Sequence, residues 1–263
     1  MPAGCRPREW ALDPRGPRAA GGTGGPPGGL RRRHGGGGRV SLGQVWAIAR
    51  KDLLTEGRSK ETLNGLFFFA ALVLLVFGFA LGPDRARLEQ AAAGVLWVGF
   101  ILTGVLGLTR AFQVERENEC LEGLLLYPGD RGALYLGKLL GNVVFMLGLE
   151  AAVFPCFAFF YNMPLWGALP GLLLTAALGT AGFAAVGTLF AAMTMHLRAR
   201  EVMFPLLLLP FVVPVLLAAV KGTEAFLRGA GRAEAFPWLA LLALFDLVFV
   251  TVSLFALEWI VEE

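Results

Sequence analysis

Long runs of apolar residues, separated by shorter polar stretches, determine the architecture that this sequence predicts. Each run spans about 20 residues, the length that an α-helix needs to cross ~30 Å of hydrocarbon. We predict six membrane-spanning helices, over residues 62–81, 90–109, 138–161, 168–195, 202–220 and 236–257. The fold class that follows is an all-α integral membrane protein in which the six spans form one bundle.

An amphipathic pattern precedes the first span. Trp46, Ala49 and Leu53 make an apolar stripe, with charged residues at 50–52 beside it. Tryptophan flanked by cations is typical of the membrane–water interface. We therefore predict an N-terminal interfacial helix over residues 42–58, lying on the membrane before the first crossing.

The only long polar stretch between two spans is residues 110–138, which hold nine charged residues. Glu115, Glu119 and Glu122 recur at spacings of four and three, so they share one helical face. The apolar residues fall largely on the other face: Val114, Leu121, Leu124 and Leu125. The pattern predicts an amphipathic helix, ended by the Pro-Gly pair at 128–129, that lies on the bilayer and offers carboxylates to a partner. The alternative is a solvated connecting helix with no partner.

Residues 1–40 have a different composition. They contain 12 of the 35 glycines and 6 of the 15 prolines, and no apolar run. Such a segment cannot bury an apolar face, so we predict a disordered tail, followed by a six-span membrane domain over residues 41–263. We do not assign nucleic-acid binding to the arginines of the tail. An alternative is that the native protein starts nearer Val40.

The composition of the whole chain agrees with a membrane protein and gives no sign of soluble-type catalysis. The chain is 56% hydrophobic and 16% charged, whereas soluble domains are about half apolar and about a quarter charged. Residues 132–138 have the spacing of a Walker A loop, but Leu139 stands where that loop needs a hydroxyl group. The only histidines, His34 and His196, match no metal motif. We predict a non-catalytic protein with no metal site and no directly bound cofactor.

The distribution of Lys and Arg beside the spans predicts the orientation. With the N-terminus inside, ten cations lie on the inner side and five on the outer side. The inner ones are Arg50, Lys51, Arg58, Lys60, Arg110, Arg116, Arg131, Lys138, Arg198 and Arg200, and the outer ones are Arg85, Arg87, Lys221, Arg228 and Arg232. An excess of cations marks the cytoplasmic side, so we predict a multi-pass protein with both termini and the 110–138 stretch in the cytoplasm.

Two acids lie near the middle of predicted spans, Glu150 in the third and Asp246 in the sixth. Carboxyl groups inside a membrane are costly, and this makes them functional candidates by default. No Lys or Arg lies at the same depth, so they are protonated, share a proton or face a polar groove. One functional hypothesis for these two acids is an ion-coupled carrier that uses both of them.

Other spans carry backbone-breaking or small residues. Pro205, Pro210 and Pro214 occur within the fifth span, so we predict a kinked or broken helix that is either a moving part or a static bend. Small residues recur on one face of the third and fourth spans, and these faces suit close helix packing or contact with another subunit. Asn142 is a candidate for a hydrogen bond between helices.

Three segments together resemble the B subunit of the cytochrome c maturation system, a heme exporter membrane subunit. They are VWAIARKDLLTEGRSKETLNGLFFF at 45–69, FQVERENECLEGLLLYPGDRGALYLGK at 112–138 and LLLLPFVVPVLLAA at 206–219. The resemblance covers residues 45–257, and the tail has no counterpart in the family.

This resemblance implies an ABC-2-like permease in the bacterial inner membrane. The partners it implies are a cytoplasmic ATPase subunit, docked on the helix around residues 115–126, a heme-handling membrane subunit, a small single-span subunit and a periplasmic heme chaperone. ATP is hydrolysed by the partner, heme is the substrate, and a homodimer is expected because ABC permeases work as twelve-span pairs. The alternatives are an ABC-2-type exporter of another substrate and a non-conducting transducer that releases a heme-loaded chaperone.

Overall fold

The computed structural model describes residues 42–58, 60–117, 131–162, 167–194, 200–230 and 232–260, all of them within the compact unit Val40–Glu263. Within these ranges the chain forms helices and no strand. The helices are α1 (Leu42–Arg58), α2 (Lys60–Leu81), α3 (Arg85–Glu117), α5 (Arg131–Tyr161), α6 (Leu169–Met193), α7 (Arg200–Leu227) and α8 (Arg232–Ile260). Six of them, α2 to α8, are long and apolar enough to cross a membrane, which confirms the predicted fold class.

Several helices are longer than the apolar runs that predicted them. α3 begins at Arg85 rather than at residue 90 and continues to Glu117, so the start of the polar stretch is the end of the second spanning helix. α7 continues past residue 220 to Leu227, where Lys221 and Glu224 form an ion pair of 3.0 Å. Hydropathy falls where a helix leaves the hydrocarbon, but its backbone hydrogen bonds continue, and side-chain pairs one turn apart support them.

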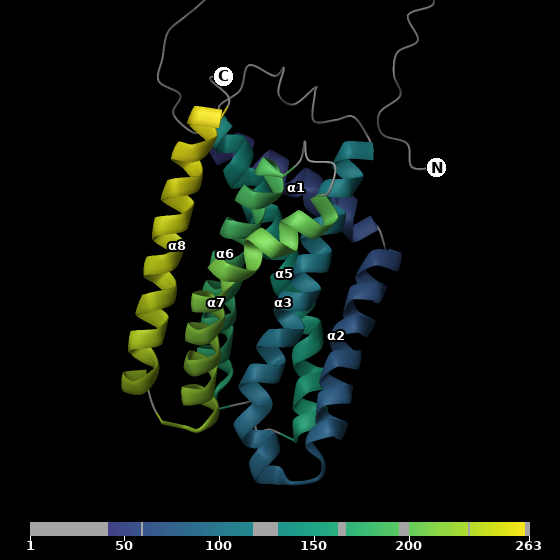
Figure 1. The fold of residues 1–263 in the computed structure, drawn as a ribbon, viewed down its shortest axis with the longest axis vertical. Coiled ribbons are helices and arrows are strands. Elements are labelled where there is room, and N and C mark those ends of the chain that lie inside the picture. The colour runs from purple at the N-terminus through teal and green to yellow at the C-terminus, as the bar shows by residue number, and fades with distance from the viewer. Residues whose placement is uncertain are drawn as a thin grey trace, which may run out of the picture. The chain divides into compact units, whose positions relative to one another are not determined.

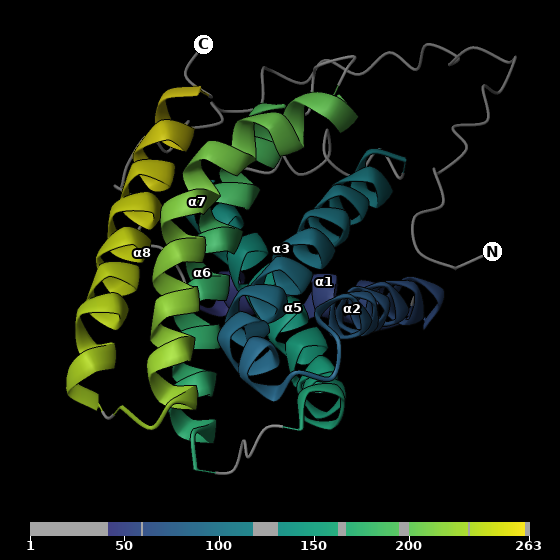
Figure 2. The ribbon, with the colours of Figure 1, turned by 60° about the horizontal axis from the view of Figure 1, so that its bottom comes forward.

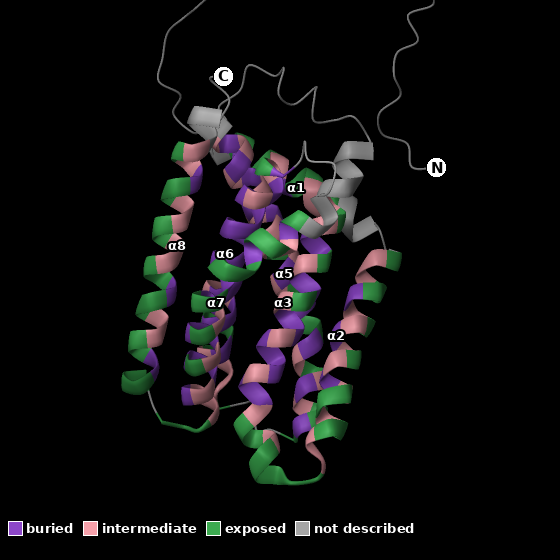
Figure 3. Ribbon diagram, in the orientation of Figure 1, coloured by how far each residue is buried: buried purple, intermediate pink, exposed green. Residues whose placement is uncertain are grey.

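The spanning helices run up and down in one bundle, with their polar ends gathered at two opposite sides (Figure 1). α1, the last turns of α3 and α8 and the first turns of α5 and α7 lie at one side, which we call the α1 end. The connections from α2 to α3 and from α7 to α8 lie at the opposite end. Large apolar residues of α2 and α8 are exposed, among them Phe68, Phe79 and Leu247. Figure 3 shows exposed positions along both helices. Such outward faces suit a lipid environment.

α6 is the central helix of the bundle and contacts α3, α5, α7 and α8. Four of its glycines each receive a side chain from a neighbouring helix, and a methyl group placed on any of them would overlap that side chain. The pairs are Gly171 with Phe226, Gly179 with Trp97, Gly182 with Asp246, and Gly187 with Leu108. The small residues of the fourth span therefore serve packing within this chain, one of the two roles that the sequence left open.

α1 packs chiefly against the first turns of α5. A methyl group on Gly137 would lie 2.7 Å from Ile48 Cβ, and one on Gly141 would lie 3.4 Å from Asp52 Cβ. Lys138 Nζ lies 4.0 Å from Asp52 Oδ2, and the Lys138 side chain is only 11% exposed. The segment with Walker A spacing is thus part of a helix whose glycines admit α1, and its lysine lies beside a carboxylate of α1.

We predict that the charge pair at this contact contributes to the seating of α1. Replacing Lys138 by Glu places two carboxylates together in a half-buried contact, and we expect a loss of about 1 kcal/mol of stability. Exchanging both charges, Asp52→Lys with Lys138→Asp, restores part of that loss. Thermal unfolding of the purified protein in detergent measures both effects. Equal stability of the single and double variants would show that the pair makes no contribution.

α7 is bent. It contains Pro205, Pro210 and Pro214 and is nevertheless one helix from Arg200 to Leu227. Its first turns run at an angle to the rest of the helix (Figure 2). Proline removes a backbone donor and crowds the preceding turn, which accounts for the bend. Of the two forms that the sequence allowed, the described helix has the kinked one.

The buried side chains form two clusters, one in each half of the bundle. The cluster nearer the opposite end contains Leu96, Trp97, Phe100, Val153 and Phe157, among others. The cluster nearer the α1 end includes Leu108, Tyr135, Met146, Phe183 and Phe204. Between Met146 and Val153 on α5, the chain passes from one cluster to the other. This boundary places the site described next.

Candidate functional site

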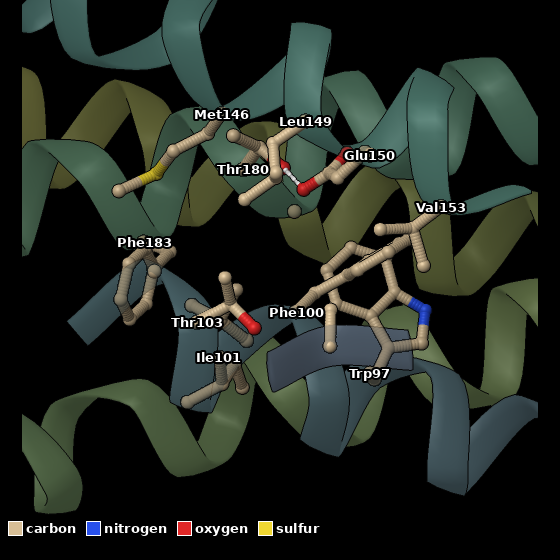
Figure 4. Close-up of a pocket in the computed structure, with 14 residues that line it drawn as sticks. Trp97, Phe100, Ile101, Thr103, Met146, Leu149, Glu150, Val153, Thr180 and Phe183 are labelled. Carbon is tan, nitrogen blue, oxygen red and sulfur yellow. Dashed lines mark hydrogen bonds between the residues drawn. The ribbon is translucent and has the colours of Figure 1, made fainter. Parts of the chain in front are cut away.

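Glu150 lies on α5 at the boundary between the two apolar clusters, and it is the only buried residue of an ionisable acid or base type in the described chain. Its side chain is 5% exposed. Thr180 of α6 donates a hydrogen bond of 2.5 Å from Oγ1 to Glu150 Oε1, drawn as a dashed line in Figure 4. The second carboxyl oxygen, Oε2, is buried and makes no hydrogen bond with any described residue. The structure therefore gives the Glu150 carboxyl one partner for its two oxygens.

A small pocket adjoins this carboxyl group. α3, α5 and α6 supply most of its wall, with one residue each from α2 and α7: Ala70, Trp97, Phe100, Ile101, Thr103, Gly104, Met146, Leu149, Glu150, Val153, Gly179, Thr180, Phe183 and Val215. Figure 4 shows the aromatic rings opposite Glu150 and Thr180. The cavity offers about 20 Å³ to the centre of a water-sized sphere, which is room for water but far too little for a porphyrin. Glu150 is the only charged residue of this wall.

Asp246 of α8 occupies a separate place. Its Oδ1 atom is buried without a partner among the described residues and lies against the backbone of Gly182 on α6. Thr180, which binds Glu150, and Gly182 are two positions apart, which is roughly 200° around a helix. The two intramembrane acids therefore contact opposite faces of α6, an arrangement that gives no support to a directly shared proton. Neither acid forms an ion pair within the described ranges.

Further side-chain hydrogen bonds join neighbouring helices on both sides of Glu150 along the bundle. Asn142 donates to Thr188 Oγ1 at 3.0 Å, which confirms the predicted hydrogen bond between helices. Tyr135 donates to the carbonyl oxygen of Ala185 at 3.1 Å. Trp97 donates from Nε1 to Thr223 at 2.9 Å. Membrane helices use such bonds to fix their mutual positions.

The sequence reasoning missed Thr180 and Trp97, which complete the Glu150 site. One signal was present: the fourth span carries threonines at 175, 180, 188 and 194 in an otherwise apolar and small-residue helix, and all four are buried. A buried hydroxyl group in a spanning helix needs a partner, either on its own helix or on a neighbour.

The predicted docking segment is described only in part. Glu115 lies in the last turns of α3, at the α1 end of the bundle. The other predicted docking residues, Glu119, Leu121, Glu122 and Leu125, lie outside the described residues. The structure places the beginning of this segment at the side that gathers α1 and the start of α5.

The fold and the site together define an all-α, six-span membrane protein in which buried polar side chains connect neighbouring helices to a central one. The family model described as "CcmB protein" matches residues 43–262, which is most of the chain. The chain belongs to the CcmB family.

Curated relatives agree with this assignment. The chain is 32% identical to heme exporter protein B of Pseudomonas aeruginosa, over 73% of this chain and 86% of that protein. It is 34% identical to heme exporter protein B of Paracoccus denitrificans, over 80% and 94%. The protein of the same name from Escherichia coli is 31% identical over 68% and 81%. The matches therefore extend over most of the membrane domain in each case.

Proposed function

We propose that this chain is the membrane permease subunit of an ABC-type complex that exports or delivers heme for c-type cytochrome biogenesis. The observation that carries the proposal is the family match over residues 43–262, which coincides with the helical bundle. The relatives that are named heme exporter protein B match 73% and 80% of the chain. The helices are apolar and are joined by a few buried hydrogen bonds between side chains. This construction suits a subunit that changes conformation while a partner subunit hydrolyses ATP.

The partner that we propose is a cytoplasmic ATPase docked on the segment that begins at Glu115. The supporting feature is the placement of the first residues of this segment, in the last turns of α3, at the α1 end, the side to which the excess of Lys and Arg belongs. The further partners in this proposal are a heme-handling membrane subunit, a small single-span subunit, a periplasmic heme chaperone and a second copy of this chain. The proposed location is the bacterial inner membrane, with both termini in the cytoplasm.

Deleting the gene and staining membrane proteins for covalently bound heme tests this function. We expect the loss of c-type cytochromes in the deletion strain and their return when residues 1–263 are supplied from a plasmid. Supplying residues 41–263 alone tests whether the tail is dispensable, as the proposed division into tail and membrane domain requires. Unchanged c-type cytochromes in the deletion strain would favour an exporter of another substrate.

A second candidate function is supported by the size of the cavity in the bundle. The pocket beside Glu150 accommodates water and not a porphyrin, which favours a transducer that converts ATP hydrolysis by the partner into release of a heme-loaded chaperone. The state of the chaperone in the deletion strain distinguishes the two functions. A conducting subunit leaves the chaperone without heme, whereas a transducer leaves the heme-loaded chaperone to accumulate.

A further inference from the structure

The pocket beside Glu150 has the composition of a site for a very small polar ligand. It is a cavity of about 20 Å³, measured for the centre of a water-sized sphere, inside a spanning bundle. Glu150 lines it and is only 5% exposed, and its carboxyl oxygen Oε2 is buried. One carboxyl oxygen accepts a hydrogen bond from Thr180, and the other has no partner among the described residues. A buried polar atom of this kind calls for an explanation.

The surroundings of the carboxyl group disfavour a bare negative charge. No residue of the pocket wall is cationic, whether it comes from α2, α3, α6 or α7. On α8 the nearest acid, Asp246, faces the other side of α6. On α1 the charged residues Lys51 and Asp52 pack near the start of α5, at Lys138 and Gly141. An unpaired carboxylate costs several kcal/mol in such a place.

The same wall does not suit a metal ion. Its side-chain oxygens come from Thr103, Glu150 and Thr180 only, and the Thr103 hydroxyl group already donates to the carbonyl oxygen of Gly99 at 2.7 Å. Hard cations such as Ca²⁺ and Mg²⁺ take about six or more oxygen ligands. Among the described residues, no three metal-ligating side chains come together. The remaining lone pairs of Thr103 and the free oxygen of Glu150 match the needs of water.

We propose that Glu150 is a mid-membrane proton site, whose carboxyl group is neutral in the closed bundle and exchanges its proton with water that enters the pocket. In the closed bundle the proton resides on Oε2, while Oε1 accepts the hydrogen bond from Thr180. When water reaches the pocket, the proton passes from the carboxyl group to that water, which becomes hydronium, and a carboxylate remains. Transfer of a proton from hydronium back to the carboxylate reverses the step.

The site lies where the two apolar clusters meet, so a movement of the helices at this boundary changes the environment of the Glu150 carboxyl group. The wall contains members of both apolar clusters, Trp97 and Val153 from one and Met146 and Phe183 from the other. Glu150 and Thr180 connect α5 to α6 across the boundary between them. Separation of the two halves at this boundary admits water and permits the charged form, whereas closure expels water and favours the neutral form.

Infrared difference spectroscopy of the full chain in lipid bilayers tests the proposal. A neutral carboxyl group has a carbonyl stretching band that a carboxylate lacks. We expect a band at neutral pH that is lost in Glu150→Gln, retained in Asp246→Asn and shifted when D₂O replaces H₂O. Thr180→Val keeps Glu150 and removes its donor, so we expect the band to remain and to move to higher frequency.

The outcomes separate clearly. A carboxylate band in place of the carbonyl band, assigned by its loss in Glu150→Gln, would overturn the proposal. A carbonyl band that does not shift in D₂O would overturn the exchange with water. If Glu150→Gln does not accumulate in the membrane, the Thr180→Val spectrum decides, and an unchanged spectrum counts against the site. The measurement needs neither heme nor the ATPase, so its failure is distinct from failure of the proposed function.

Discussion

Gly179→Ala is expected to destabilise the bundle strongly, although it adds only one methyl group. The new Cβ would overlap Trp97 Cη2 and lie 2.8 Å from Cζ3, on the rigid edge of the indole ring. The ring cannot turn away freely because its Nε1 donates to Thr223 at 2.9 Å. Overpacking of this kind costs ~1–3 kcal/mol. Thermal unfolding in detergent, followed by size-exclusion chromatography, measures the loss.

Two further variants establish the cause. Gly148→Ala makes the same substitution in α5, where no atom lies within 4 Å of the added methyl group and the residue is exposed, so we expect no loss of stability. Adding Trp97→Phe to Gly179→Ala removes the ring atoms that clash, and part of the stability should return. If Gly148→Ala is as damaging as Gly179→Ala, the effect belongs to helical glycines in general rather than to the contact with Trp97.

The spans were predictable because a membrane imposes a strong and local requirement. A helix that crosses the hydrocarbon needs about 20 apolar residues in a row, and such runs can be read without knowing what they contact. The helix over residues 42–58 was predicted with the bounds that α1 has, because amphipathic periodicity and a flanking tryptophan are also local signals. Neither prediction needed tertiary information.

The ends of the helices were less predictable. α3 extends outward to Arg85, where Arg85 and Glu89 form an ion pair of 2.9 Å, and this part of the helix lacks an apolar run. Continuation of a helix beyond the hydrocarbon depends on the hydrogen bonds of the backbone and on pairs one turn apart, which hydropathy does not register. Because hydropathy does not register this continuation, the sequence indicated a separate helix beginning at residue 110. In the structure, residues 110–117 are the end of α3.

The residues that contact Glu150 could not be predicted from the sequence. Glu150 stood out because an acid in an apolar span is rare, but its binding to Thr180 depends on how α5 and α6 are rotated against each other. Likewise Gly179 was read as a small residue suited to packing, while its contact with Trp97 links residues that are far apart in the chain. Local patterns indicate which residues are unusual, and tertiary packing determines what each of them meets.

Charge reversal in the predicted docking segment has the second large expected effect. Replacing Glu115, Glu119 and Glu122 by Lys exchanges three carboxylates on one predicted helical face for three cations. Opposed charges at an interface suppress binding strongly. We expect co-purification of the ATPase with the tagged chain to fall more than ~10-fold, which corresponds to at least about 1.4 kcal/mol. Covalent heme on c-type cytochromes should fall with it.

A single glutamate-to-lysine change at the end of α3 opposite Glu115 provides the control. Glu89 of α3 is exposed, and its ion pair with Arg85 is a surface pair of little energetic weight. Glu89→Lys should therefore leave the amount of bound ATPase unchanged. A second comparison replaces Leu121 and Leu125 by Ala, which removes apolar area and keeps the three acids. It distinguishes the contribution of charge to ATPase binding from the contribution of apolar burial. Normal co-purification with the triple variant would place the ATPase elsewhere on the chain, since three cations in the predicted docking segment would then be compatible with binding.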